Sequence, residues 1–131
     1  MKIDIDYLKL ILNKFVESDT QYINTSNFQN SIDENLEKFA FHWDILIDKG
    51  FLVRTDGKFH NLIKRGANYN NNSIQHTFVR LNDFGYKFYE ALEEKEFLNK
   101  IKTSFKNISM DTLMNMSSKF LEVKVLNAIV G

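Results

Sequence analysis

The chain lacks the features that mark several classes of protein. It has no cysteine among its 131 residues, which excludes disulfides, thiolate zinc sites and a cysteine nucleophile. No apolar run approaches the roughly 20 residues that a membrane-spanning helix needs. No segment combines a basic start, an apolar stretch and a small-residue cleavage site. We therefore expect a soluble cytoplasmic protein with no membrane partner.

Motifs of the common catalytic sites are also missing. The sequence contains no Gly-rich phosphate loop, no HExxH helix and no GxSxG turn. His42 has no carboxylate three or four residues away on its predicted helix. His60 and His76, on opposing predicted strands, have no placed carboxylate or cysteine to complete a metal site. We expect no enzymatic activity, no cofactor and no bound metal.

Apolar and aromatic side chains, in contrast, are abundant. Hydrophobic residues make up 44% of the chain and aromatic residues 14%, enough for one domain with a buried core. The formal net charge is zero, but the charge is unevenly distributed. Residues 1–50 carry five Lys and nine Asp or Glu, a balance of −4, whereas residues 51–81 carry five basic residues and one Asp, a balance of +4. The basic charge is concentrated in one segment.

The stretch from Asp33 to Leu52 organises the predicted fold. Its apolar residues follow the spacing of one helix face: Leu36, Phe39, Ala40, Trp43, Leu46 and Ile47. Asp33 precedes this pattern and is the predicted N-cap. Lys49 and Gly50 predict the end of the helix, because a cation suits the last turn and glycine tolerates a left-handed conformation. A short apolar strand follows at 51–53.

The remaining elements follow in the order of a winged-helix domain. In chain order we predict a helix to about Ser18 capped by Asp4 or Asp6, a short strand at 22–23, a short helix at 27–30, the organising helix, and strands at 58–65 and 74–81. The expected buried face of the first helix is Ile5, Leu8, Ile11, Leu12 and Phe15. The two long strands form a hairpin with a polar tip. The predicted fold class is α+β, mainly α, with a three-helix core and a β-hairpin wing in residues 1–93.

Residues 94–131 are predicted to form a C-terminal helical extension. A helix capped by Asn82 or Asp83 has an apolar rhythm that continues beyond Glu94, either as one long helix or as two joined near that residue. Ser109 caps a last helix that runs to about Val130. That helix is apolar over most of its circumference and must be covered on several sides. Dimerisation and folding back on its own domain both remain open.

The organising helix and its turn resemble a known signature. Phe41-His42-Trp43, Leu46 and 50–52 are similar to the aromatic-His-x-x-x-Leu-x-x-x-Gly-Leu-Ile pattern of a small bacterial and phage-encoded family, known only as a domain of unknown function. Residues 81–88 resemble the family's second pattern, Leu-Thr-x-x-Gly-His-x-Phe, and differ from it at Asn82 and Tyr86. The resemblance implies a winged-helix-like fold and no particular activity.

In a winged-helix protein the third helix enters the DNA major groove and the wing contacts the backbone. The candidate DNA-binding residues lie on the wing and on the third helix: Lys58, Lys64, Arg65, Arg80, Lys38, His42 and Lys49. Four carboxylates surround Lys38 and Lys49 on the third helix, which opposes phosphate binding there. We therefore expect the wing to make the main DNA contact. The alternative interpretation is that the wing charges only protect an exposed strand edge from aggregation.

Protein contacts provide the alternative function. The candidate interface residues are apolar side chains directed away from the core faces of the third and last helices: Phe41, Ile45, Met114, Leu121 and Val125. One hypothesis is a DNA-associated transcriptional regulator, dimeric through the last helix. The other is a protein-interaction module without DNA binding. The resemblance in fold, which is an analogy, favours the first.

Overall fold

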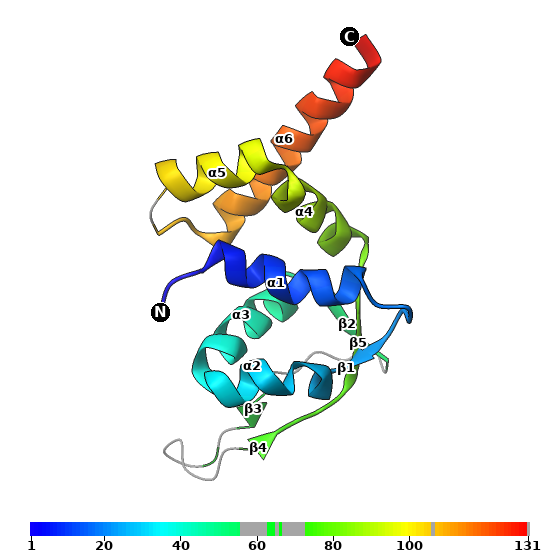
Figure 1. Cartoon of the computed structure of the whole chain (residues 1–131), viewed down its shortest axis with the longest axis vertical. Coiled ribbons are helices and arrows are strands. Elements are labelled where there is room, and N and C mark those ends of the chain that lie inside the picture. The colour runs from blue at the N-terminus through cyan, green and yellow to red at the C-terminus, as the bar shows by residue number, and fades with distance from the viewer. Residues whose placement is uncertain (56–62, 65, 67–72, 106, 131) are drawn as a thin grey trace.

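The computed structural model describes residues 1–55, 63–64, 66, 73–105 and 107–130 (Figure 1). Their elements, in chain order, are α1 (Ile5–Val16), β1 (Ile23–Asn24), the 3-10 helix η1 (Thr25–Phe28), α2 (Gln29–Glu34), α3 (Leu36–Asp48), β2 (Leu52–Arg54), β3 (Ile63–Lys64), β4 (Ser73–Ile74), β5 (Phe78–Leu81), α4 (Asp83–Glu93), α5 (Lys95–Ser104) and α6 (Met110–Val130). The fold is mainly helical with a small antiparallel sheet, which confirms the predicted α+β class.

An aromatic cluster forms the centre of the core. Trp43 is 1% exposed, and its ring lies 6.1 Å from that of Phe15, 5.5 Å from that of Phe28 and 5.5 Å from that of Phe39. These residues come from α1, η1 and α3, so the cluster joins three elements. The expected face of α1 is buried, although the helix ends at Val16 and not at Ser18. In Figure 1, α1 runs between α3 on one side and α4 and α5 on the other.

The start of α3 differs from the prediction. Asn35, not Asp33, is the N-cap, and its side-chain oxygen accepts a hydrogen bond from the Lys38 N–H at 3.1 Å. Asp33 lies inside α2, where its carboxylate accepts from Gln29. The extended backbone at Asn35 ends α2 and begins α3. This single residue therefore connects the two helices. The predicted helix end is confirmed: Gly50 has a φ of +73°.

The sheet has the strand order β1-β5-β2, with antiparallel pairs throughout. The single strand predicted at 74–81 is wrong, because it divides into β4 and β5. Between them, the Thr77 N–H donates to the Thr25 hydroxyl and the Thr77 carbonyl accepts from the Thr25 N–H, which replaces ladder bonds with bonds to η1. β4 pairs with β3 in a separate two-stranded sheet. Most of the strand predicted at 58–65 lies outside the described residues, as does the polar tip.

The structure decides between one helix and two after Asn82, whereas dimerisation through the last helix stays a prediction. The helix after Asn82 is two helices, because Glu94 has an extended backbone between α4 and α5. Ser109 accepts a hydrogen bond from the Thr112 N–H at the start of α6, as predicted. The first half of α6 packs on α4 and buries Met110 and Leu113, whereas Glu122–Val130 is exposed throughout. α6 therefore covers its own domain over one half and projects from it over the other (Figure 1).

At Gly85, α4 lies close to Leu81 and Phe51. A Cβ atom at this position would lie 2.3 Å from Cδ1 and 2.7 Å from Cγ of Leu81, and 3.3 Å from the Phe51 carbonyl oxygen. Leu81 is buried and has little room to move. We expect Gly85→Ala to lower the free energy of unfolding by about 1–3 kcal/mol through overpacking, measured by urea unfolding. Tyr86→Ala, at the exposed neighbouring position, is the control, and equal stabilities of Gly85→Ala and the wild type would contradict this prediction.

Candidate functional site

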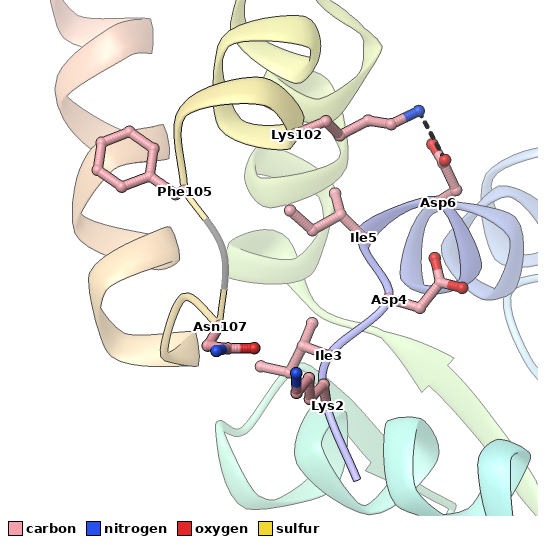
Figure 2. Close-up of a pocket in the computed structure, with 8 residues that line it drawn as sticks. All are labelled: Lys2, Ile3, Asp4, Ile5, Asp6, Lys102, Phe105 and Asn107. Carbon is pink, nitrogen blue, oxygen red and sulfur yellow. Dashed lines mark ion pairs between the residues drawn. The ribbon is translucent and has the colours of Figure 1, made fainter.

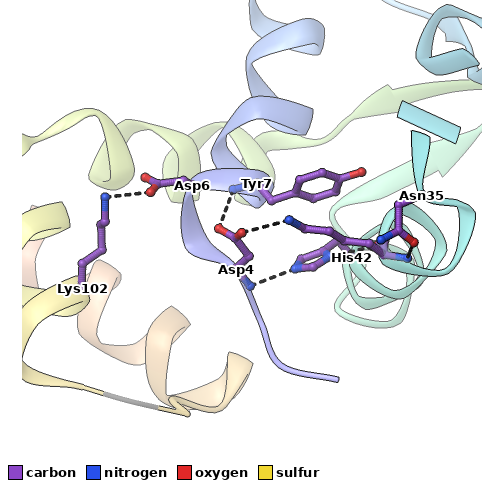
Figure 3. Close-up of polar contacts among 7 residues, drawn as sticks. Asp4, Asp6, Tyr7, Asn35, His42 and Lys102 are labelled. Carbon is purple, nitrogen blue, oxygen red and sulfur yellow. Dashed lines mark hydrogen bonds and ion pairs between the residues drawn. The ribbon is translucent and has the colours of Figure 1, made fainter. Parts of the chain in front are cut away.

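His42 lies in the interface between α3 and the N-terminal segment. Its side chain is 1% exposed. The Asp4 N–H donates to Nε2 at 2.9 Å, so Nδ1 carries the proton and donates to the Lys38 carbonyl oxygen at 2.7 Å (Figure 3). Burial lowers the pKa of this imidazole, which favours the neutral form that these two bonds require. In this arrangement His42 is not accessible to a DNA base edge.

Asp4 joins the same cluster through its side chain. The carboxylate caps α1 by accepting from the Tyr7 N–H at 3.1 Å, as predicted, and forms an ion pair with Lys38 at 3.2 Å. Burial raises the pKa of Asp4, but the Tyr7 N–H and the Lys38 ammonium outweigh it, so the pKa is lowered overall. Lys38 also lies 4.6 Å from the centre of the Tyr7 ring. The cation of Lys38 is thus held by residues of the N-terminal segment and α1.

Lys49, the third candidate on α3, is held by α6. Its ammonium group lies 2.7 Å from a carboxylate oxygen of Asp111. An exposed ion pair of this kind contributes little stability, but a phosphate would have to displace the carboxylate. The structure therefore places the two α3 cations, Lys38 and Lys49, beside acidic side chains of other segments.

The outer face of α3 is acidic and apolar. Phe41 and Ile45, the predicted protein-contact residues of this helix, are partly buried and line one shallow pocket of about 370 Å³. The other lining residues are Met1, Ala40 and three acidic residues, Glu37, Asp44 and Asp48. A face of this composition repels phosphate and offers an apolar floor. It brings the two predicted contact residues of α3 together.

The candidate wing residues are only partly described. Lys58 and Arg65 lie outside the described residues, as does His60, and Lys64 is placed in β3. Arg80 lies in β5 opposite Val53 and is partly exposed. The idea that basic wing residues meet a phosphate backbone stays a prediction.

His76 has a structural partner. Its Nδ1 lies 2.9 Å from the Thr25 hydroxyl, so the side chain helps to hold the connection between β4 and β5 against η1. Among the residues that the structure places, there is no group of three His, Cys, Asp or Glu side chains close enough to hold a metal ion.

A second pocket, of about 380 Å³, separates the N-terminal segment from the α5–α6 connection (Figure 2). Asp6 and Lys102 form an ion pair at its rim at 2.7 Å, while the nearby carboxylate of Asp4 is held by Lys38. Asn107 has a φ of +60° and turns the chain towards α6. The two carboxylates that line this pocket, Asp4 and Asp6, are thus engaged in a helix cap and in ion pairs, and they do not form an acid–base pair.

The last helix carries a run of exposed apolar side chains. Met114 and Leu121, two of its predicted interface residues, are partly buried, and Val125 is 58% exposed. Beyond them, Leu126 is 59%, Ile129 77% and Val130 81% exposed. Our candidate residues omitted these three, although the apolar character of the whole circumference was the available signal. None of the described helices is long and apolar enough to cross a membrane.

The cluster at His42 predicts a pH-dependent stability. The unfolded imidazole titrates near its ordinary pKa of 6.5, and the folded one below it. Well above pH 6.5 both states are neutral and this group leaves the stability unchanged. As the pH falls through 6.5, the unfolded state binds a proton first and stability decreases. We expect His42→Gln to remove this part of the loss between pH 7.5 and 5.5 in urea unfolding. His76→Gln is the control.

A direct test is the NMR titration of the His42 ring. We expect a midpoint below 6.5 and the tautomer with the proton on Nδ1. A midpoint at or above 6.5 would show that Asp4 and Lys38 do not hold the neutral ring as the geometry indicates.

No protein-family model, no curated protein and no solved structure matches this chain.

Proposed function

We propose that this chain is a winged-helix-like protein-interaction module whose binding element is α6. The order of α1, β1, α2, α3 and the following strands is the order expected for a winged helix, and the strands of its sheet pair as β1-β5-β2. Such a fold does not define an activity by itself. The function must be argued from the surfaces that the fold leaves accessible.

The surface of α3 supports protein contact over DNA reading. The candidate cations Lys38 and Lys49 are paired with carboxylates, and His42 is buried. The outer face instead combines Phe41 and Ile45 with acidic side chains. DNA-reading helices expose basic and polar groups that reach base edges and phosphates. The outer face of α3 is acidic and does not offer such groups.

One observation carries the proposal: the projecting half of α6 is apolar and uncovered. From Glu122 to Val130 every residue is exposed, and five of these nine residues are Val, Leu or Ile. Monomeric soluble proteins rarely expose contiguous apolar patches larger than a few hundred Å², and such patches mark interaction sites. A protein surface, rather than a nucleic acid, is the partner that such side chains fit.

A second candidate function is DNA contact through the wing. The observation in its favour is the charge of residues 51–81, where five basic residues accompany one acidic residue. It would make the chain a DNA-associated regulator that uses phosphate and minor-groove contacts, with α3 facing away from the duplex.

Fluorescence anisotropy with labelled random-sequence duplex DNA separates the two functions. For an interaction module we expect no binding at physiological salt, and at most weak non-specific binding at low salt. Binding that persists at physiological salt, weakens steeply as salt is raised further, and is lost in Lys64→Glu/Arg65→Glu would overturn the module and support the wing. Lys95→Glu/Lys100→Glu, on exposed positions of α5, is the matched control for the change of charge.

A further inference from the structure

The projecting half of α6 forms one wall of an open groove of about 640 Å³. Leu121, Val125 and Ile129 lie four residues apart along this wall, so their side chains form a ladder on one side of the helix. The opposite wall is the outer side of α4, at Lys87 and Glu90. Figure 1 shows α6 extending past α4 and away from the core.

The ladder becomes less covered along the helix. Leu121 is partly buried, Val125 is 58% exposed and Ile129 is 77% exposed. Four of the nine projecting residues are β-branched, and β-branched residues favour a helix less than Ala, Leu or Lys do. Most of the stability of a helix comes from packing of an apolar face. This half of α6 lacks such packing within the described chain, and a partner against the groove would supply it.

Charge indicates what kind of partner the groove accepts. Its charged side chains are two lysines and two glutamates, namely Lys87, Lys124, Glu90 and Glu122. Lys124 is paired with Glu94, and Lys87 with Asp83. A balanced rim selects neither a strongly acidic nor a strongly basic partner. It is compatible with a second copy of this chain, because two such surfaces do not bring an excess of like charge together.

A two-fold axis at Val125 makes the ladder complementary to itself. In an antiparallel pair of α6 helices, Val125 faces its own copy and Leu121 faces Ile129 of the other chain, because both lie four residues from the axis. Glu122 then faces Ala128, a small side chain three residues on the other side. Isologous contacts of this kind are the commonest in soluble oligomers.

We infer, building on the function proposed above, that the groove between α4 and α6 takes the α6 helix of a second copy of this chain. Nine helical residues extend about 14 Å, so this segment alone covers only part of the roughly 800 Å² that each partner buries in a standard interface. The outer side of α4 must therefore contribute, and we expect a weak, reversible dimer.

Sedimentation velocity of the 131-residue chain, from low micromolar to several hundred micromolar, tests this pairing. We expect a monomer–dimer equilibrium in the wild type. Val125→Glu places two carboxylates against each other at the axis and should raise the dissociation constant at least about tenfold. Val123→Glu is the matched control: it is 55% exposed, carries the same change and lies on the opposite side of the helix, so we expect it to dimerise as the wild type does.

A mixing experiment tests the two-fold axis itself. Val125→Glu and Val125→Lys should each be monomeric alone and should form a heterodimer when mixed, since residue 125 meets its own copy. Far-UV circular dichroism of each variant checks that the fold is kept. A monomeric wild type at the highest concentration, open-ended oligomers, equal loss in Val123→Glu and Val125→Glu, or no heterodimer on mixing would each overturn the inference.

The two proposals fail in different ways. A monomeric chain without DNA affinity would overturn self-association and leave α6 as the binding surface for another protein. A dimeric chain with salt-sensitive DNA binding through Lys64 and Arg65 would overturn the proposed function and leave the α6 pairing in place.

Discussion

The burial of Trp43 is the constraint on which the rest of the structure depends. Its ring packs with Phe15 of α1, Phe28 of η1 and Phe39 of α3, so the three elements are held by one set of contacts. Loss of a buried aromatic ring of this kind typically costs about 3–5 kcal/mol. Because Trp43 faces inward, the orientation of α3 about its own axis is fixed. Phe41, on the outer face, is then the residue that α3 can offer to a partner.

That orientation also determines how the cations of α3 are used. Lys38 and His42 face the N-terminal segment, where Asp4 provides both a carboxylate and a backbone N–H. Lys49 faces the beginning of α6, where it meets Asp111. α3 therefore helps to attach the N-terminal segment and the first turn of α6 to the core. This use of its side chains agrees with the acidic character of its outer face.

Much of the fold could be predicted because local patterns and tertiary packing agree. The apolar stripes of α1 and α3, the stop at Gly50 and the cap at Asn82 are local signals, and the structure confirms them. The N-cap of α3 was wrong because Asp33 and Asn35 are both good caps, and the length of α2 decides between them. The division into β4 and β5 follows from hydrogen bonds between Thr77 and Thr25, about fifty residues apart, which no pattern within either strand reveals.

The candidate site was less predictable because its contacts also join residues that are far apart in the sequence. The partner of His42 is the backbone N–H of Asp4, 38 residues earlier, whereas a search by helical spacing looks only three or four residues away. The apolar circumference of α6 indicated that the helix needs cover on several sides, but spacing could not tell which half the domain covers. The structure divides the helix near Leu121, where contact with α4 gives way to an exposed segment.

The direction of α6 links the core to the exposed surface. Lys49 of α3 pairs with Asp111 in its first turn, and Lys124 in its projecting half pairs with Glu94, between α4 and α5. Such exposed pairs add little stability. The buried Met110 and Leu113 provide the anchoring free energy. A helix anchored at one end by buried side chains carries its apolar ladder beyond the core, where a partner can contact it.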